Sequence, residues 1–251
     1  MIYTVSSTQN TAIKAIKKLS SARSRKSSGL FLVEGEKCVR EVMGIEGLCT
    51  QLIVLEQEKQ EYSDLLEHYS GDVFFVSEPV LESISTVKSP QGIIAVCKDS
   101  KLNLAEADGL VIILDGISDP GNLGTIIRTA DAVGAARVLT LDESADYLSP
   151  KVVRASMGSV FHIPVKKVDM AELLSLKEAG YMLLGADLAG ETDFEVEQKN
   201  IGLVIGSEAH GISENVKGLL DKKIKLRMFG QAESLNAAVA AGILMYKIVE
   251  M

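Results

Sequence analysis

The 251-residue chain is long enough for one large domain or two modest ones, and its 47% hydrophobic and 24% charged residues are ordinary for a globular protein. No apolar run approaches the ~20 residues that a membrane-spanning helix needs, and residues 1–10 lack the apolar core of a secretory signal. The three cysteines and three histidines show no metal-ligand or redox spacing. We therefore expect reduced thiols, no metal and a cytoplasmic protein.

Basic residues are concentrated at the start of the chain. The formal net charge is −8, which argues weakly against nucleic acid as a partner, but residues 1–29 hold six basic side chains and no acidic one. A basic arm on an acidic body is a candidate phosphate-binding element, and an ordinary solvated helix is the alternative. The side chains concerned are Lys14, Lys17, Lys18, Arg23, Arg25 and Lys26.

The first hundred residues indicate a small α/β domain after this arm. Residues 8–20 have the spacing of a basic amphipathic helix, and the serine-rich segment 20–29 is expected to be a mobile link. Apolar runs and helical spacing then alternate, which is typical of an α/β domain over residues 30–98. We expect strands at 31–33, 51–55, 73–76 and 93–96, and helices at 36–43, 58–69 and 79–85.

A polar stretch, 99–107, is the predicted linker to a second domain over residues 108–251. This half also alternates, and the apolar run 110–114 is typical of a strand buried on both faces. The fold class is therefore α/β, with a mostly parallel sheet that helices cover on both faces. We expect strands at 110–114, 138–141, 160–165, 181–185, 203–205 and 224–228, and helices at 123–133, 150–157, 170–179 and 214–220.

The loop after the first strand of this sheet opens a helix. Its glycines do not match GxGxxG, and it lacks the lysine of a phosphate-binding loop. Asn122 is expected to cap the helix. Arg128 lies further along the helix among apolar neighbours, so its charge should have a partner or a ligand. An arginine that reaches out to a surface carboxylate is the alternative.

Two later loops also follow apolar strands. In the loop 205–213, Gly206 frees the backbone for close approach of a ligand, and Glu208 is the lone acid. A simple turn, with Ser213 capping the next helix, is the alternative. In the loop 229–236, Ser234 stands where a helix N-cap is expected.

The helix that begins in this last loop is rich in small and apolar residues, which predicts burial on all sides. The carboxyl ends of parallel strands meet at one edge of a sheet, where ligands bind. The three loops should therefore gather their polar side chains there. These are Asn122, Arg128, Glu208, Ser234 and Asn236.

The same three loops carry a family resemblance. The segments DPGNLGTIIRTADAVGA, LVIGSEAHGIS and ESLNAAVAAGILMY resemble, in order and spacing, the three signature motifs of SpoU (TrmH-like) RNA 2′-O-ribose methyltransferases. The resemblance covers residues 108–251. Within residues 30–97, FLVEGEKCVREVM and VKSPQGIIAVC resemble the RNA substrate-binding domain that often precedes the methyltransferase domain.

The resemblance implies a trefoil knot, bound S-adenosylmethionine, and a homodimer that methylates RNA, ribosomal more than transfer RNA. By position, Arg128 matches the proposed catalytic residue of the family. The other polar residues of the three motifs are matched by Asn122, Glu208, Ser234 and Asn236. The basic arm would then contact RNA. Arg227 stands where the family often has proline. The segments that would hold the cofactor contribute Leu139, Thr140, Leu141, Gly185, Ala186, Ile205, Gly206, Leu226, Met228, Ser234 and Leu235.

In the implied reaction, a ribose 2′-hydroxyl attacks the methyl carbon in line with the departing sulfur, so the protein must align the reactants and assist loss of a proton. A guanidinium does not readily lose a proton in proteins. Arg128 is therefore better suited to hold an RNA phosphate and stabilise a developing alkoxide than to act as a base. Three alternatives remain: an RNA-binding module without activity, a knotted methyltransferase acting on a base nitrogen, and a domain that binds another nucleotide.

Overall fold

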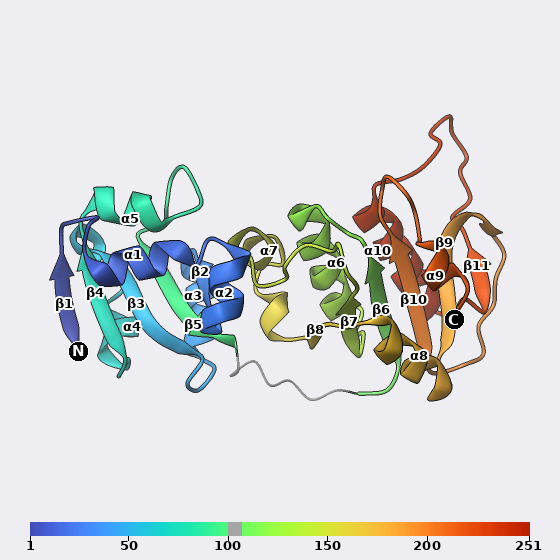
Figure 1. Ribbon diagram of the computed structural model, residues 1–251, viewed down its shortest axis with the longest axis horizontal. Coiled ribbons are helices and arrows are strands. Elements are labelled where there is room, and N and C mark those ends of the chain that lie inside the picture. The colour runs from blue at the N-terminus through green and yellow to red at the C-terminus, as the bar shows by residue number, and fades with distance from the viewer. Residues whose placement is uncertain (100–106) are drawn as a thin grey trace. The chain divides into compact units, whose positions relative to one another are not determined.

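A computed structural model describes residues 1–99 and 107–251, which form two compact units (Figure 1). The first unit contains residues 1–99 and 148–161, and the second contains 107–147 and 162–251. Residues 148–161 thus belong to the first unit, although the predicted division assigns them to the second domain. Apart from its two ends, the predicted linker 99–107 lies outside the described residues.

The first unit is built on a five-stranded mixed sheet with the order β1-β4-β3-β5-β2. Strand β5 runs antiparallel to β2 and β3, whereas the pairs of β4 with β1 and β3 are parallel. The strands are β1 (Ile2–Val5), β2 (Leu30–Glu34), β3 (Cys49–Leu55), β4 (Asp72–Val76) and β5 (Ile93–Lys98). The sequence analysis missed β1, a four-residue edge strand in which only Val5 is buried and which therefore lacks a clear apolar pattern.

Helices α1 (Thr11–Lys18) and α2 (Ala22–Ser28) form the basic arm. The amphipathic spacing that predicts α1 buries Ile13 and Ile16 in the core of the first unit. The mobile link expected at 20–29 is wrong, because Ser21 caps α2 and Gly29 ends it with φ 65°. Arg25 is buried, and its Nη1 donates to the carbonyls of Leu19 and Ser20 at 2.8 and 2.9 Å. It therefore does not present its charge to a ligand.

The other helices of the first unit are α3 (Glu36–Met43), α4 (Ser63–Glu67), α5 (Glu78–Ile84) and α7 (Pro150–Ala155). The helix predicted at 58–69 is wrong in extent, because a 3-10 turn at Glu56–Glu58 and the short α4 replace it. Between them Tyr62 has a non-helical φ of −107° and ψ of 17°. Its side chain is buried, and its hydroxyl donates to the Gln91 carbonyl at 2.6 Å, which fixes this break.

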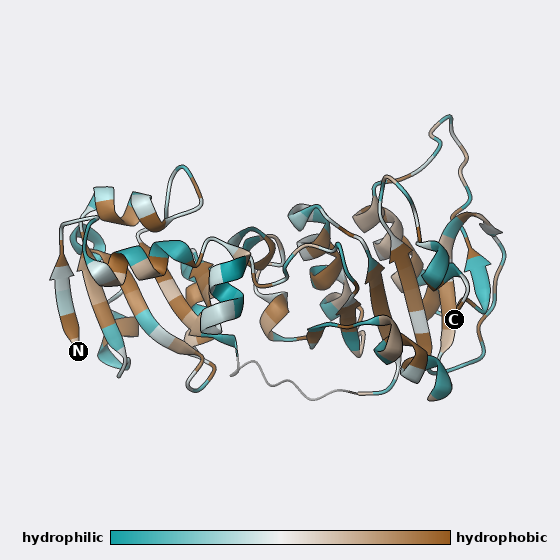
Figure 2. Ribbon diagram, in the orientation of Figure 1, coloured by the Kyte–Doolittle hydropathy of each residue, from teal (hydrophilic) through white to brown (hydrophobic). Residues whose placement is uncertain are grey.

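The second unit contains a six-stranded sheet with the order β11-β9-β10-β6-β7-β8, in which every pair is parallel. The predicted parallel α/β fold is thereby confirmed. The strands are β6 (Leu110–Asp115), β7 (Arg137–Thr140), β8 (Val165–Lys167), β9 (Met182–Glu191), β10 (Ile201–Gly206) and β11 (Lys222–Ile224). The central strands are strongly hydrophobic (Figure 2), as burial on both faces requires.

Four helices accompany this sheet: α6 (Pro120–Ala132), α8 (Met170–Glu178), α9 (Glu214–Lys217) and α10 (Ala237–Val249). Side chains of α8 and α9 pack on one face, where Leu173 and Val216 join a core that includes Val111 and Val204. Helix α10 packs on α6 and β10. In the part of the chain that the structure describes, no helix is long and apolar enough to cross a membrane, and no cluster of metal-ligating side chains occurs.

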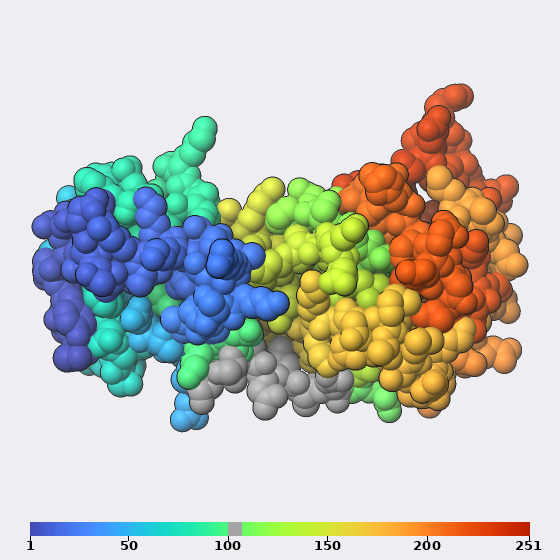
Figure 3. Space-filling model, in the orientation of Figure 1, coloured from blue at the N-terminus to red at the C-terminus, as the bar shows by residue number. Residues whose placement is uncertain are grey.

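Two predicted strands of the second half are wrong. At 160–165, Ser159–Phe161 forms a 3-10 turn with buried side chains, and the strand begins only at Val165, after a proline. At 224–228, pairing of β11 with β9 ends at Ile224, where the register shifts. The chain from Lys225 to Asn236 is irregular and includes a loop that projects from the second unit (Figures 1 and 3).

Candidate active site

Side chains from all three predicted loops are joined by hydrogen bonds. Nδ2 of Asn236 donates to Oδ1 of Asn122 at 3.0 Å, and Nδ2 of Asn122 donates to Oε1 of Glu208. These residues lie after β6, after β10 and just before α10, far apart in sequence. The sheet therefore gathers Asn122, Glu208 and Asn236 at one edge, as the order of the strands predicts.

The residues that cap α6 and α10 differ from the predicted ones. Asp119 caps α6 by accepting the backbone N–H of Asn122 at 2.9 Å, so the prediction of Asn122 as the cap is wrong. Asn236, rather than the predicted Ser234, caps α10, and its Oδ1 accepts the N–H of Ala238 and of Val239 at 3.0 and 3.3 Å. Asn236 can fill both roles because an amide carries an acceptor and a donor.

The loop after β10 is closed on itself by its own backbone. Ser207 and Gly211 exchange two hydrogen bonds of 3.0 and 2.8 Å. A Cβ atom at Gly206 would lie 2.2 Å from the Gly211 carbonyl carbon, so only glycine fits there. The buried carboxylate of Asp115, at the end of β6, accepts the N–H of Ser213 at 2.6 Å and ties this loop to the first. Sequence reasoning missed Asp115, although an acid that ends a buried strand is a usable signal.

A cavity of about 450 Å³ adjoins the middle of β9, the loop after β10 and the segment before α10. Seven of the predicted cofactor residues line it, and Glu208 lies at the same wall. Sequence reasoning missed Asp187 and Leu188, which come two and three residues after the predicted strand 181–185, and Lys225, which lies inside the predicted strand 224–228. The seven predicted residues are Ala186, Ile205, Gly206, Leu226, Met228, Ser234 and Leu235.

Four predicted cofactor residues are not among those that line this cavity. Leu139, Thr140 and Leu141 belong to β7 and its end, which β6 separates from β10 in the sheet, and all three are buried. At Gly185, a Cβ atom would lie 2.3 Å from Leu220 Cδ1. This glycine therefore permits close packing against Leu220, and the cofactor contact of its backbone stays a prediction.

Arg128 lies on the solvent side of α6, while Ile126, Ile127 and Ala130 point into the core. The expectation that its apolar neighbours surround it is therefore wrong, because they occupy the opposite face of the helix. No hydrogen bond or ion pair joins Arg128 to another residue of the described ranges. Its guanidinium is available for a ligand in solution, and the structure does not link it to the Asn122–Glu208 pair.

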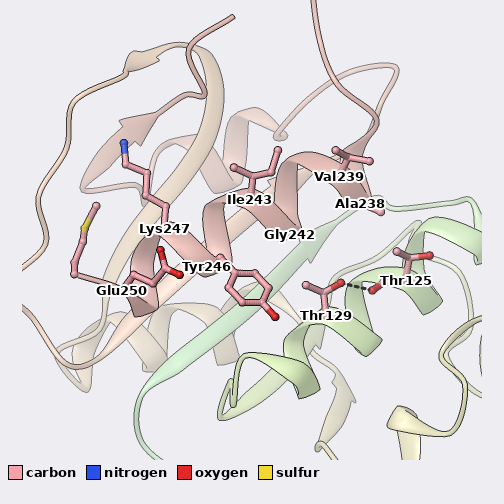
Figure 4. Close-up of a pocket in the computed structure, with 10 residues that line it drawn as sticks. Thr125, Thr129, Ala238, Val239, Gly242, Ile243, Tyr246, Lys247 and Glu250 are labelled. Carbon is pink, nitrogen blue, oxygen red and sulfur yellow. Dashed lines mark hydrogen bonds between the residues drawn. The ribbon is translucent and has the colours of Figure 1, made fainter.

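Helix α10 is buried on one side only, contrary to the prediction. Ala238, Ala241 and Met245 face the core, whereas Val239 is 50%, Ile243 45% and Tyr246 47% exposed. Figure 4 shows the outer side chains together with Thr125 and Thr129 of α6, which line the same groove. A Cβ atom at Gly242 would lie 3.5 Å from Thr129 Cγ2, an ordinary van der Waals distance, so the packing of α10 on α6 does not require glycine there. The sequence pattern shows which residues of this helix are apolar, but not which of them are buried by the rest of the chain.

Comparisons with known proteins identify the family of this chain. Residues 109–246 match the SpoU rRNA Methylase family, and residues 10–95 match the MRM3-like substrate binding domain. The chain belongs to the SpoU rRNA methylase family. The predicted family, and with it the methyltransferase class and S-adenosylmethionine as cofactor, is confirmed.

Relatives of the family match along nearly the whole chain. The 23S rRNA (guanosine(2553)-2′-O)-methyltransferase RlmP of Bacillus subtilis is 34% identical over 97% of this chain and 98% of that protein. Two solved structures hold S-adenosylmethionine. The SpoU methyltransferase AviRb of Streptomyces viridochromogenes has a TM-score of 0.86 and 28% identity, covering 96% of this chain and 98% of that one. An rRNA methyltransferase of Sinorhizobium meliloti has a TM-score of 0.84 and 28% identity, covering 98% and 97%.

Proposed function

We propose that this protein transfers the methyl group of S-adenosylmethionine to a ribose 2′-hydroxyl of ribosomal RNA. The observation that carries the proposal is the hydrogen-bonded chain of Asn236, Asn122 and Glu208 beside the 450 Å³ cavity, built from the three family motifs. The activity named for the Bacillus subtilis relative, which matches over 97% of this chain, supports ribosomal RNA as the substrate.

The cavity suits the cofactor in size and in chemistry. Its volume lies in the range of about 300–1,000 Å³ that is typical of small-molecule sites. Leu226, Met228 and Leu235 offer an apolar surface for the adenine ring, and the carboxylates of Asp187 and Glu208 offer acceptors for the ribose hydroxyls and the ammonium group. When bound, the cofactor supplies a methyl group on a positively charged sulfur, which is open to nucleophilic attack.

Asn122, Glu208 and Asn236 act by positioning in this proposal. The Glu208 carboxylate fixes the direction of the Asn122 amide, and Asn236 fixes it from the other side. Because Asn236 is itself held by two backbone N–H groups of α10, the three loops form one unit with little freedom. Such preorganisation aligns reacting groups without a further entropic cost at the moment of reaction. Ser234, at the cavity wall, would close the site over the cofactor.

Arg128 is proposed to hold the phosphate next to the target ribose. Its side chain is exposed and has no partner among the described residues, so its five N–H donors are free for a phosphate. A fixed guanidinium near the attacking oxygen also stabilises the negative charge that develops as the hydroxyl loses its proton.

We infer further that a second copy of the chain covers the outer face of α10, giving a homodimer. An exposed row of Val239, Ile243 and Tyr246 on one helix is costly to leave in water and suits a self-complementary contact. The family resemblance supports the same inference, and it also underlies our proposals of a trefoil knot and a cytoplasmic location. The exposed Lys14, Lys17, Lys18, Arg23 and Lys26 of the arm remain the proposed RNA contacts of the first unit.

The experiment uses labelled S-adenosylmethionine and unmodified cellular RNA, separated into ribosomal and transfer fractions. The product is digested to nucleosides, and the position of the label is determined for the native protein, Arg128→Lys and Arg128→Ala. We expect a ribose 2′-label in ribosomal RNA, with turnover reduced at least about 10-fold in Arg128→Lys because the forked donor geometry is lost. A label on a base, or on transfer RNA alone, would overturn the proposed substrate. Native turnover in Arg128→Lys would remove the proposed role of its geometry.

A further inference from the structure

The segment Leu226–Phe229 has two faces with different characters. Leu226 and Met228 line the cavity, whereas Arg227 and Phe229 are exposed. Because lining and exposed residues alternate along it, this one stretch separates the cavity from an outer surface made by Arg227 and Phe229. The loop that follows projects from the second unit (Figures 1 and 3).

Phe229 is 89% exposed, the most exposed large hydrophobic side chain of the described residues. Burial is the usual fate of phenylalanine, and at this exposure the ring gains almost nothing from the fold of its own chain. It is not an isolated apolar side chain. The Arg227 guanidinium carbon lies 5.4 Å from the centre of the Phe229 ring, within the range of a cation–π contact.

Arg227 has no carboxylate partner in the part of the chain that the structure describes. A flat aromatic ring with a guanidinium beside it offers two things together: a face on which a base can stack, and donors for a phosphate.

We propose that Arg227 and Phe229 form a platform on which an unpaired nucleobase of the substrate RNA stacks, next to the ribose that is methylated. The inference rests on the proposed function and extends it to RNA recognition. Phe229 supplies the stacking face, and Arg227 contacts the neighbouring phosphate. Because Met228, between them, lines the cavity from the inner side, a base held here lies one residue's thickness from the cofactor wall. The ligand is single-stranded RNA, since paired bases leave no free face for an aromatic side chain.

The test measures binding of unmodified large-subunit ribosomal RNA, transcribed in vitro, by filter retention at several salt concentrations. Phe229→Ala should weaken binding about 10-fold and Phe229→Trp should restore it, because stacking tolerates any aromatic ring. Arg227→Gln should also lower the slope of log affinity against log salt by about 0.7, the value for one phosphate contact on a single strand. Leu174→Ala, at an exposed apolar position on α8, is the matched control and should leave binding unchanged.

Two further measurements keep the platform distinct from other roles of Phe229. Calorimetry with S-adenosylmethionine should give native affinity for Phe229→Ala, and sedimentation should give the native mass. Native RNA affinity in Phe229→Ala overturns the platform. So does a loss of cofactor binding or a change of mass, because Phe229 would then serve the cavity or a contact between copies. The binding measurement does not require turnover. If the native protein binds the RNA without methylating it, the proposed function is overturned, and the Phe229 and Arg227 variants still test the platform.

Discussion

Asn236 joins two tasks in one side chain, since its oxygen caps α10 and its nitrogen holds Asn122. Asn236→Asp keeps the acceptor but sets a carboxylate oxygen against Oδ1 of Asn122. The stability to denaturant should change by less than about 0.5 kcal/mol, because aspartate caps as well as asparagine. Single-turnover methylation should slow at least about 10-fold. Asn236→Ala should also lose about 1 kcal/mol of stability. Native turnover in Asn236→Asp would exclude the hydrogen-bonded chain from catalysis.

Tyr62 gives a prediction for alkaline pH. Burial, with the nearby Glu58 charge, raises the pKa of the Tyr62 phenol to about 12, and its hydroxyl donates to Gln91. A raised folded-state pKa means that the stability is fully present below the unfolded pKa of about 10 and is lost between about pH 10 and 12. Tyr62→Phe should cost about 1 kcal/mol at pH 7 and weaken this alkaline loss. Urea unfolding at pH 7 and pH 11 measures both. An unchanged alkaline loss in the variant would assign it to another group.

For single residues, the sequence predicts which polar side chains belong to the site, but not which hydrogen bond each of them makes. Polar side chains after apolar strands identified Asn122, Glu208 and Asn236, because strand order brings those loops together. The caps were assigned to the wrong neighbours, since Asp119 and Asn236 compete with Asn122 and Ser234 for the same backbone donors. Spacing along the chain cannot decide between candidates one to three residues apart.

At the scale of elements, α10 carries the clearest prediction. Ile243 lies in the exposed apolar face and is 45% exposed. Ile243→Glu would bury a carboxylate in the proposed contact between two copies, which is costly without a partner. We expect the dissociation constant of the dimer to rise at least about 100-fold, as measured by sedimentation across a concentration series.

The matched control for this variant is Leu174→Glu, on α8, where the replaced side chain is 44% exposed. It should leave the dimer intact while adding the same charge at a similar exposure. A dimer that survives in Ile243→Glu, or that is lost equally in both variants, would contradict the assignment of α10 as the contact surface.

Elements with strong periodic patterns were predictable, and those set by contacts were not. The buried strands β6 and β10 and the amphipathic α1 follow directly from apolar spacing. Helix α2 is almost entirely polar, so it has no periodic apolar pattern that could predict it. It is defined by local features, the buried Arg25 and its end at Gly29. Residues 225–228 do not form the expected strand because β9, with which they would pair, ends at Glu191. The sequence of 224–228 itself carries no sign of this.

For the whole molecule, charge separation predicts a strong salt dependence of RNA binding. The net charge is −8, so affinity must come from local basic surfaces such as the exposed Lys14, Lys17 and Lys18 of α1. Replacing these three by glutamine should lower the slope of log affinity against log salt by about 2. The control replaces the exposed but scattered Lys37, Lys98 and Lys199 and should change the slope less. Equal slopes in the two triple variants would remove the arm from RNA binding.

Residues 148–161 determine how this protein can be divided. They lie inside the span that matches the SpoU family, yet they belong to the first unit, where α7 contacts β2 and the Phe161 ring stacks on Phe31. A protease that cuts between residues 99 and 107 would therefore nick the backbone without releasing either unit. A truncated chain that starts at residue 108 would expose Val152, Val153 and Phe161 to water and should aggregate. A gene fusion that exchanges one unit for that of another protein must therefore keep this fourteen-residue segment together with the first unit, on which it packs.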